Sequence, residues 1–173
     1  MGTRFSPKYG YGNGGGADDF IRESCVGWGN PELTFPGVSS CSTITLRDGA
    51  GNLSAVHLTK ADSVITAARL LETARANLPG AITGILHVGG LNLEGSGWVS
   101  QPDFVWPQRA ATIRRLLQVP NAATYYIDTG LHASDVRVVA SAGGAFDVSM
   151  KPESHYPADY VNGWNPYLSH RLV

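Results

Sequence analysis

The chain has 173 residues, of which 43% are hydrophobic and 16% are charged. This composition is typical of one globular domain and excludes an intrinsically disordered or coiled-coil protein. The formal net charge of -1 provides no general attraction to nucleic acid or to an anionic membrane, so neither is expected as a partner.

The N-terminal residues 1–33 predict a flexible lead-in to a single domain that spans residues 1–173. The run YGYGNGGG at residues 9–16 is unsuited to a helix or a long strand. No apolar run has the length of a membrane span, and the first residues lack the apolar core of a signal peptide. We therefore expect a protein that is secreted or injected into a target cell without a cleaved signal, or that is otherwise cytoplasmic.

A β-hairpin is predicted where regular structure is expected to start, near Cys41. Residues 42–47 alternate and are rich in β-branched side chains, which indicates a strand. An Asp-Gly turn follows, and residues 53–58 form the return strand. Because the two strands of a hairpin lie side by side, we expect Cys41 and His57 to lie close together at its open end.

Two helices and four further strands are predicted after the hairpin. Helical spacing of apolar residues indicates a helix from 64 to 78, capped by Asp62 or Ser63, and Pro107 starts a second helix. The strands are expected at 81–88, which reads as a central strand covered on both faces, and at 124–128, 136–140 and 146–150.

This element order predicts an α/β fold with a layered, β-sandwich-like core of mixed and antiparallel strands, flanked by two helices. The C-terminal residues 152–173 carry several aromatic side chains among prolines. Loose tails rarely contain so many aromatic residues, so we expect this extension to lie across the body of the domain in an ordered form.

Cys41 is the strongest candidate nucleophile. A buried free cysteine is common and inert, but a thiol beside an imidazole can be deprotonated, and His57 is expected there. A third group would orient the ring, and Thr34, Ser39 and the backbone carbonyls before Cys41 are candidates for it. A disulfide with Cys25 is an alternative that would remove the nucleophile.

The other histidines show no comparable pattern. His87 lies within an apolar strand and is interpreted as a core histidine, and His132, His155 and His170 have no ligand spacing. No HExxH, CxxC or clustered acidic pattern occurs, so neither a metal site nor a cofactor is expected.

The order of elements resembles the glutamine deamidase superfamily, which includes the bacterial chemoreceptor deamidases, the cytotoxic necrotizing factor catalytic domain and the Burkholderia lethal factor. The resemblance covers about residues 34–150. It is carried by three runs at strand ends: Val38-Ser39-Ser40-Cys41, Val56-His57 and Val88-Gly89-Gly90.

The resemblance implies a catalytic pair, Cys41 and His57. In that superfamily the cysteine begins a strand and the histidine follows one hairpin later, and a threonine hydroxyl or a backbone carbonyl orients the histidine. The family threonine usually lies six residues before the cysteine, where this chain has Phe35. Thr34 is one residue away and is the expected third group.

The implied activity is the conversion of a glutamine to glutamate on a target protein that presents an exposed glutamine. Ser39 and Ser40 are expected near the substrate and the oxyanion. The residues before His57 lack the glycines of the chemoreceptor enzymes, which favours a bacterial toxin or effector. Such a protein would be a hydrolase with a role in virulence, and we expect it to be a monomer. The alternatives are a chemoreceptor-type deamidase, another cysteine amidohydrolase or transglutaminase, and a non-catalytic binding module with a buried Cys41.

Overall fold

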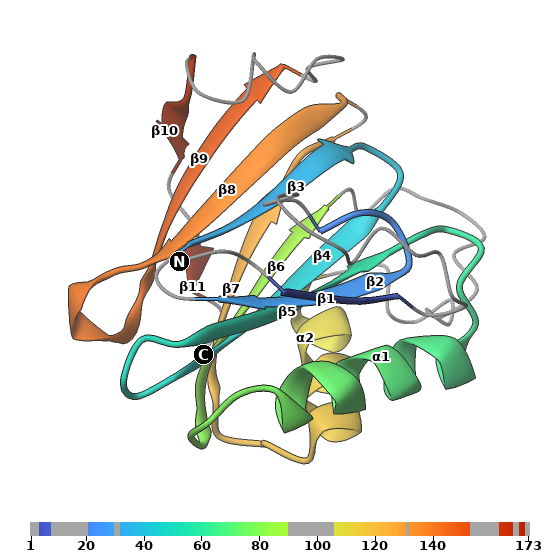
Figure 1. Ribbon diagram of the computed structural model, residues 1–173, viewed down its shortest axis with the longest axis vertical. Helices are drawn as coiled ribbons and strands as arrows, with labels where there is room; N and C mark the ends of the chain where they lie inside the picture. The colour runs from blue at the N-terminus through green and yellow to red at the C-terminus, as the bar shows by residue number, and fades with distance from the viewer. Residues whose placement is uncertain are drawn as a thin grey trace.

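The computed structural model describes residues 4–7, 21–29, 32–89, 106–130, 132–152, 163–167 and 170–171. Within these ranges two β-sheets pack face to face, and two helices cover the outer face of the larger sheet (Figure 1). The predicted α/β fold with two helices and a core of packed sheets is therefore confirmed. No helix of the described part is long and apolar enough to cross a membrane.

The larger sheet contains seven strands in the order β1-β2-β5-β4-β6-β7-β11. Neighbouring strands are antiparallel except β6 and β7, which are parallel. The apolar run forms β6, an interior strand between β4 and β7, next to the middle strand β4. The strands are β1 (Arg4–Pro7), β2 (Cys25–Gly29), β4 (Ser42–Asp48), β5 (Leu53–Leu58), β6 (Ile82–Gly89), β7 (Ala123–Asp128) and β11 (His170–Arg171).

The smaller sheet is fully antiparallel, in the order β10-β9-β8-β3. A short 3-10 helix, η2 (Ala142–Gly144), joins its two central strands. The C-terminal extension adds β10 to this sheet and β11 to the larger one. The strands are β3 (Glu32–Val38), β8 (Ser134–Ala140), β9 (Phe146–Pro152) and β10 (Asn165–Tyr167).

Regular structure begins well before Cys41, so the prediction of a flexible lead-in is wrong for the described part of residues 1–33. β1 and β2 extend the larger sheet, and β3 is an edge strand of the smaller one. Its pairing with β8 shifts register between Phe35 and Val38, around Pro36. Proline is tolerated at such a bulge in an edge strand, which is why the strand is hard to recognise in the sequence. The glycine run 9–16 lies outside the described residues.

Helices α1 (Val64–Ala76) and α2 (Trp106–Leu117) lie where the helical spacing predicted them. Ser63 is the N-cap of α1, and its hydroxyl accepts a hydrogen bond from the backbone N–H of Thr66. Asp62, the other predicted cap, instead accepts a hydrogen bond from the backbone N–H of Thr59 at 2.8 Å. Asp62 is thereby held just before the helix and close to the hairpin.

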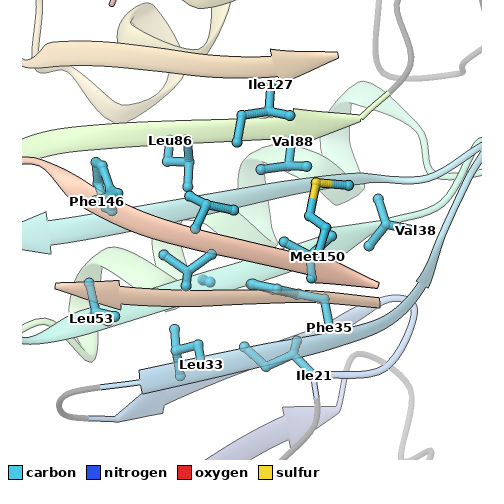
Figure 2. Packing of buried hydrophobic residues seen from close by; sticks show 14 of the residues in the cluster. Ile21, Leu33, Phe35, Val38, Leu53, Leu86, Val88, Ile127, Phe146 and Met150 are labelled. Atoms are coloured by element: carbon cyan, nitrogen blue, oxygen red, sulfur yellow. The ribbon is translucent and has the colours of Figure 1, made fainter. Parts of the chain in front are cut away.

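Each face of the larger sheet carries an apolar cluster. On β4 and β5, Ile44, Leu46 and Val56 belong to the cluster that includes the helices, whereas Leu53 and Ala55 belong to the cluster between the sheets. Figure 2 shows this second cluster, which includes Ile21, Leu33, Phe35, Val38, Leu86, Val88, Ile127, Phe146 and Met150. Because strand side chains alternate, His57 lies on the same face as Leu53 and Ala55, between the sheets.

Candidate active site

The β4–β5 hairpin brings Cys41 and His57 together. His57 is paired with Thr43 across the hairpin, and Cys41 precedes Thr43 by two residues, on the same face of the strand. The Cys41 thiol, a ring nitrogen of His57 and a carboxylate oxygen of Glu23 all lie within 4.8 Å of one another. The proximity expected from the hairpin is thus present, and it includes an acidic residue that the sequence did not indicate.

The third group at the histidine is a backbone carbonyl. Nδ1 of His57 lies 2.9 Å from the carbonyl oxygen of Ile21. A carbonyl oxygen only accepts hydrogen bonds, so Nδ1 must carry the proton and donate it. Burial lowers the pKa of His57 below its usual value, more than nearby acidic groups raise it, and the ring is therefore neutral. In this tautomer Nε2 holds a lone pair and can act as a base.

The lone pair on Nε2 is available. The imidazole is completely buried, and Nε2 has no hydrogen-bond partner among the residues that the structure describes. A buried nitrogen without a partner is costly. His57 thus combines burial, a fixed tautomer and an Nε2 atom without a partner among the described residues.

Thr34 does not hold the histidine with its hydroxyl, as the sequence led us to expect. One ring nitrogen is bonded to Ile21, and the other has no partner within the described ranges. Thr34 contributes through its backbone, whose carbonyl accepts a hydrogen bond of 2.8 Å from the N–H of Ile21. Phe35, at the position of the family threonine, instead packs edge-on against the His57 ring, with centroids 6.0 Å apart.

Residues 21–24, here called the bridging segment, connect the two sheets at the site. Ile21 donates to Thr34 of the smaller sheet and accepts from His57 of the larger one. The N–H of Ser24 donates to the carbonyl of His57 at 2.7 Å. Ser24 has a positive φ of 57°, and it forms a turn that presents the preceding Glu23 toward the thiol. His57 is therefore held at its ring and at its main chain by one short segment.

Glu23 makes the closest contact of the thiol. Sγ of Cys41 donates a hydrogen bond of 2.9 Å to Oε1 of Glu23. Cys41 is only 3% exposed, whereas the Glu23 side chain is exposed. The carboxylate therefore lies at the solvent side of the thiol, where an incoming group can displace it.

Burial, followed by the hydrogen bond and the negative charge of Glu23, raises the pKa of Cys41 to about 12. A hydrogen bond from Ser40 opposes this shift. The resting site thus contains an uncharged thiol and an uncharged imidazole rather than an ion pair.

Removing the Glu23 carboxylate should therefore accelerate alkylation of Cys41 at neutral pH. Below a thiol pKa of about 12 the thiolate fraction rises tenfold for each unit by which the pKa falls. We expect Glu23→Gln, which removes the charge, to raise the iodoacetamide rate about tenfold, and Glu23→Ala to raise it further. The rate is measured in a Cys25→Ala background, so that only Cys41 is labelled.

Glu72→Gln is the matched control, because Glu72 is an exposed carboxylate on α1. It should leave the labelling rate unchanged. For every variant the rate should climb with pH, and the wild-type curve should continue to rise above the usual thiol pKa. Equal rates for the wild type and Glu23→Ala would contradict the role of the carboxylate.

Gly89 allows β6 to pass close to the main chain at Cys41. A Cβ atom at Gly89 would lie 2.9 Å from the carbonyl oxygen of Cys41 and 2.9 Å from Oγ of Ser42. A side chain there would push β6 away from the start of β4. This close approach is a physical reason for a glycine at position 89 of the Val88-Gly89 run. Gly90 lies outside the described residues.

A disulfide between Cys25 and Cys41 is not compatible with the sheet. Cys25 on β2 pairs with His57 on β5, and β5 separates β2 from the start of β4. Two strand spacings place the backbones about 9–10 Å apart, beyond the limit of about 7 Å between the Cα atoms of a disulfide. Both cysteines are free.

The remaining predicted residues have clear positions. Ser39 and Ser40 form the bend that leads into Cys41, with Ser39 half-buried and Ser40 exposed. His87 is 2% exposed on β6, and burial lowers its pKa well below the usual range, as expected of a core histidine. Of the group at the site, only Glu23 and the Ile21 carbonyl were missed, because neither belongs to a recognisable motif.

No protein-family model matches the chain, and no curated protein matches it. The main evidence from which a function can be argued is therefore the arrangement of Cys41, His57, Glu23 and the Ile21 carbonyl.

Proposed function

We propose that the chain is a protein-glutamine deamidase that uses Cys41 as its nucleophile and His57 as its general base. The observation that carries the proposal is the neutral, buried His57, whose Nδ1–H is bonded to Ile21, whose Nε2 has no partner among the described residues, and whose ring has a nitrogen in the same cluster as the thiol. A cysteine, a histidine and an orienting group form the minimal set for acyl transfer. The resemblance to the deamidase superfamily, in which a backbone carbonyl orients the histidine of some members, supports the same reaction.

The mechanism begins with displacement of Glu23 by the substrate. The Cys41 proton passes to Nε2 of His57 while sulfur attacks the carboxamide carbon of the glutamine side chain. The protonated His57 returns this proton to the leaving nitrogen, and ammonia departs from a γ-glutamyl thioester. Water then gives a proton to His57 and attacks the thioester, which releases glutamate and restores the thiol.

The oxyanion of both steps would lie near the bend formed by Ser39 and Ser40. Backbone N–H groups at such a bend can stabilise a developing negative charge. The hydrogen bond from Ser40 already lowers the pKa of Cys41, so the same hydroxyl would favour the thiolate as it forms. We assign Ser39 and Ser40 to positioning this loop. The proposal also includes the biological role of a bacterial toxin or effector that acts on a target protein in another cell.

A non-catalytic binding module is the competing function, and one observation favours it. The resting Cys41 is 3% exposed and its pKa is raised to about 12, as for a thiol that is merely buried. An inert core thiol, however, gives no reason for a neutral imidazole with a free nitrogen in the same cluster.

The two functions are separated by incubating the purified chain with a protein mixture rich in exposed glutamines and mapping amide-to-acid conversion by mass spectrometry. A deamidase converts discrete glutamines, and enzyme alkylated at Cys41 does not. Addition of a primary amine reports how the thioester is resolved, because a transglutaminase would give amine-modified glutamine in place of glutamate. Conversion at equal rates by native and Cys41-alkylated protein would contradict the proposal.

A further inference from the structure

The same cluster has the composition of a metal site. Glu23 from the bridging segment, Cys41 before β4 and His57 on β5 each offer one ligand atom, and these atoms lie within 4.8 Å of one another. A thiolate, an imidazole and a carboxylate are the ligand types that Zn²⁺ prefers. None of the three residues is near another in the sequence, so no local motif could indicate the site.

The ligand atoms, which lie within 4.8 Å of one another, can reach the spacing of a tetrahedral ion if side chains shift by up to about 1 Å. Zinc bonds of about 2.0–2.3 Å place neighbouring ligand atoms roughly 3.3–3.8 Å apart. The thiol and the Glu23 carboxylate are at 2.9 Å and need to separate slightly. Glu23 is exposed, so its side chain can adjust without disturbing the core.

The histidine provides an independent observation. A metal-binding histidine usually donates its second ring N–H to a carbonyl or carboxylate, which fixes the tautomer that ligates. Here Nδ1 donates to the Ile21 carbonyl, and Nε2 is buried without a partner among the described residues. An Nε2 lone pair that is already oriented in this way is what a divalent ion requires.

We propose that Glu23, Cys41 and His57 bind a zinc-like divalent ion through a carboxylate oxygen, Sγ and Nε2, and that the bound ion reversibly blocks the nucleophile. Binding displaces the thiol proton to solvent, and the charges of thiolate and carboxylate balance those of the ion. Three protein ligands leave one coordination position for water. The binding site stands on the geometry alone, whereas its inhibitory effect rests on the proposed function.

Cobalt is the probe, because Co²⁺ occupies zinc sites and a cobalt–thiolate bond gives an intense near-ultraviolet charge-transfer band. Titration of the chelator-treated wild-type chain with Co²⁺ should produce this band, and Zn²⁺ should abolish it. Cys41→Ser should remove the band, and Glu23→Gln should weaken Co²⁺ binding by at least about tenfold, since even indirect partners of a metal ligand contribute that much. Cys25→Ala, which removes the other cysteine of the same sheet, should keep the band.

Three results would overturn the metal site. They are the absence of the band in the wild-type chain at millimolar Co²⁺, a band that persists in Cys41→Ser, and loss of the band in Cys25→Ala. For the inhibitory effect, Zn²⁺ should slow both iodoacetamide labelling of Cys41 and deamidation, and a chelator should restore them. Unchanged labelling with Zn²⁺ bound would overturn that part. If only metal-loaded protein deamidates glutamine, the cysteine mechanism fails and the metal site stands. If metal-free protein deamidates glutamine and Co²⁺ gives no band, the metal site fails and the cysteine mechanism stands.

Discussion

Replacing Cys41 with serine is expected to lower the rate of glutamine deamidation by at least about 10³-fold, since loss of an acyl-transfer nucleophile leaves only binding and oxyanion stabilisation. The thiol makes its closest contact with Glu23, and a serine hydroxyl can donate the same hydrogen bond. The variant should therefore fold normally, with an unchanged far-ultraviolet circular dichroism spectrum. Deamidation is measured by mass spectrometry on a glutamine that the wild type converts.

Cys25→Ala is the control for the loss of a buried thiol. Cys25 pairs with His57 from the opposite side, on β2, and it is 7% exposed. Its replacement removes a packed sulfur close to the same histidine without touching the proposed chemistry. We expect Cys25→Ala to retain activity within a small factor. Comparable losses in the two variants would mean that packing around His57, and not nucleophilic attack, limits the reaction.

Replacing His57 with asparagine or glutamine is expected to reduce deamidation by about 10²–10⁴-fold, the usual contribution of a general base. The amide nitrogen of asparagine would occupy about the position of the imidazole Nδ1 and can still donate a hydrogen bond to the Ile21 carbonyl. The amide nitrogen of glutamine would occupy about the position of Nε2 instead. Neither amide can accept and return a proton near neutral pH. Both variants should therefore lose activity, although only the first keeps the anchoring hydrogen bond.

Melting temperature separates a loss of chemistry from a loss of structure for these variants. His57 is completely buried beside Phe35, so a smaller side chain leaves a cavity and lowers stability. Phe35→Leu serves as the control, because it loosens the packing against the ring and leaves the imidazole in place. It should cost stability with a smaller loss of activity. A His57 variant that is folded and as active as the wild type would exclude this residue as the base.

The hairpin is the part of the site that the sequence predicts well. Residues 42–47 alternate, an Asp-Gly turn follows, and turn chemistry and pleat geometry are local properties that determine which residues face each other. The proximity of Cys41 and His57 follows from these local rules. The helices and β6 to β9 were predictable for the same reason, since their hydrophobic periods are regular.

The other half of the site could not be predicted, because it depends on contacts between distant segments. Ile21 contributes a carbonyl, which every residue possesses, so no side chain marks it. Glu23 follows a glycine-rich stretch that argues against regular structure, and it reaches Cys41 only because β2 pairs with β5. Thr34 was favoured because a hydroxyl is visible in a sequence, whereas a main-chain acceptor is not.

For the proposed deamidase, the bridging segment would also link catalytic competence to the order of folding. The hairpin contains its own turn and can form early, which brings the thiol and the imidazole together while the sheets are still apart. The hydrogen bond that selects the tautomer of His57 requires Ile21, and Ile21 is held in turn by Thr34 of the smaller sheet. A chain with a formed hairpin and unpacked sheets thus has both reactive groups but no defined base. If the chain is the deamidase that we propose, reactivity toward glutamine would be acquired only when the two sheets close.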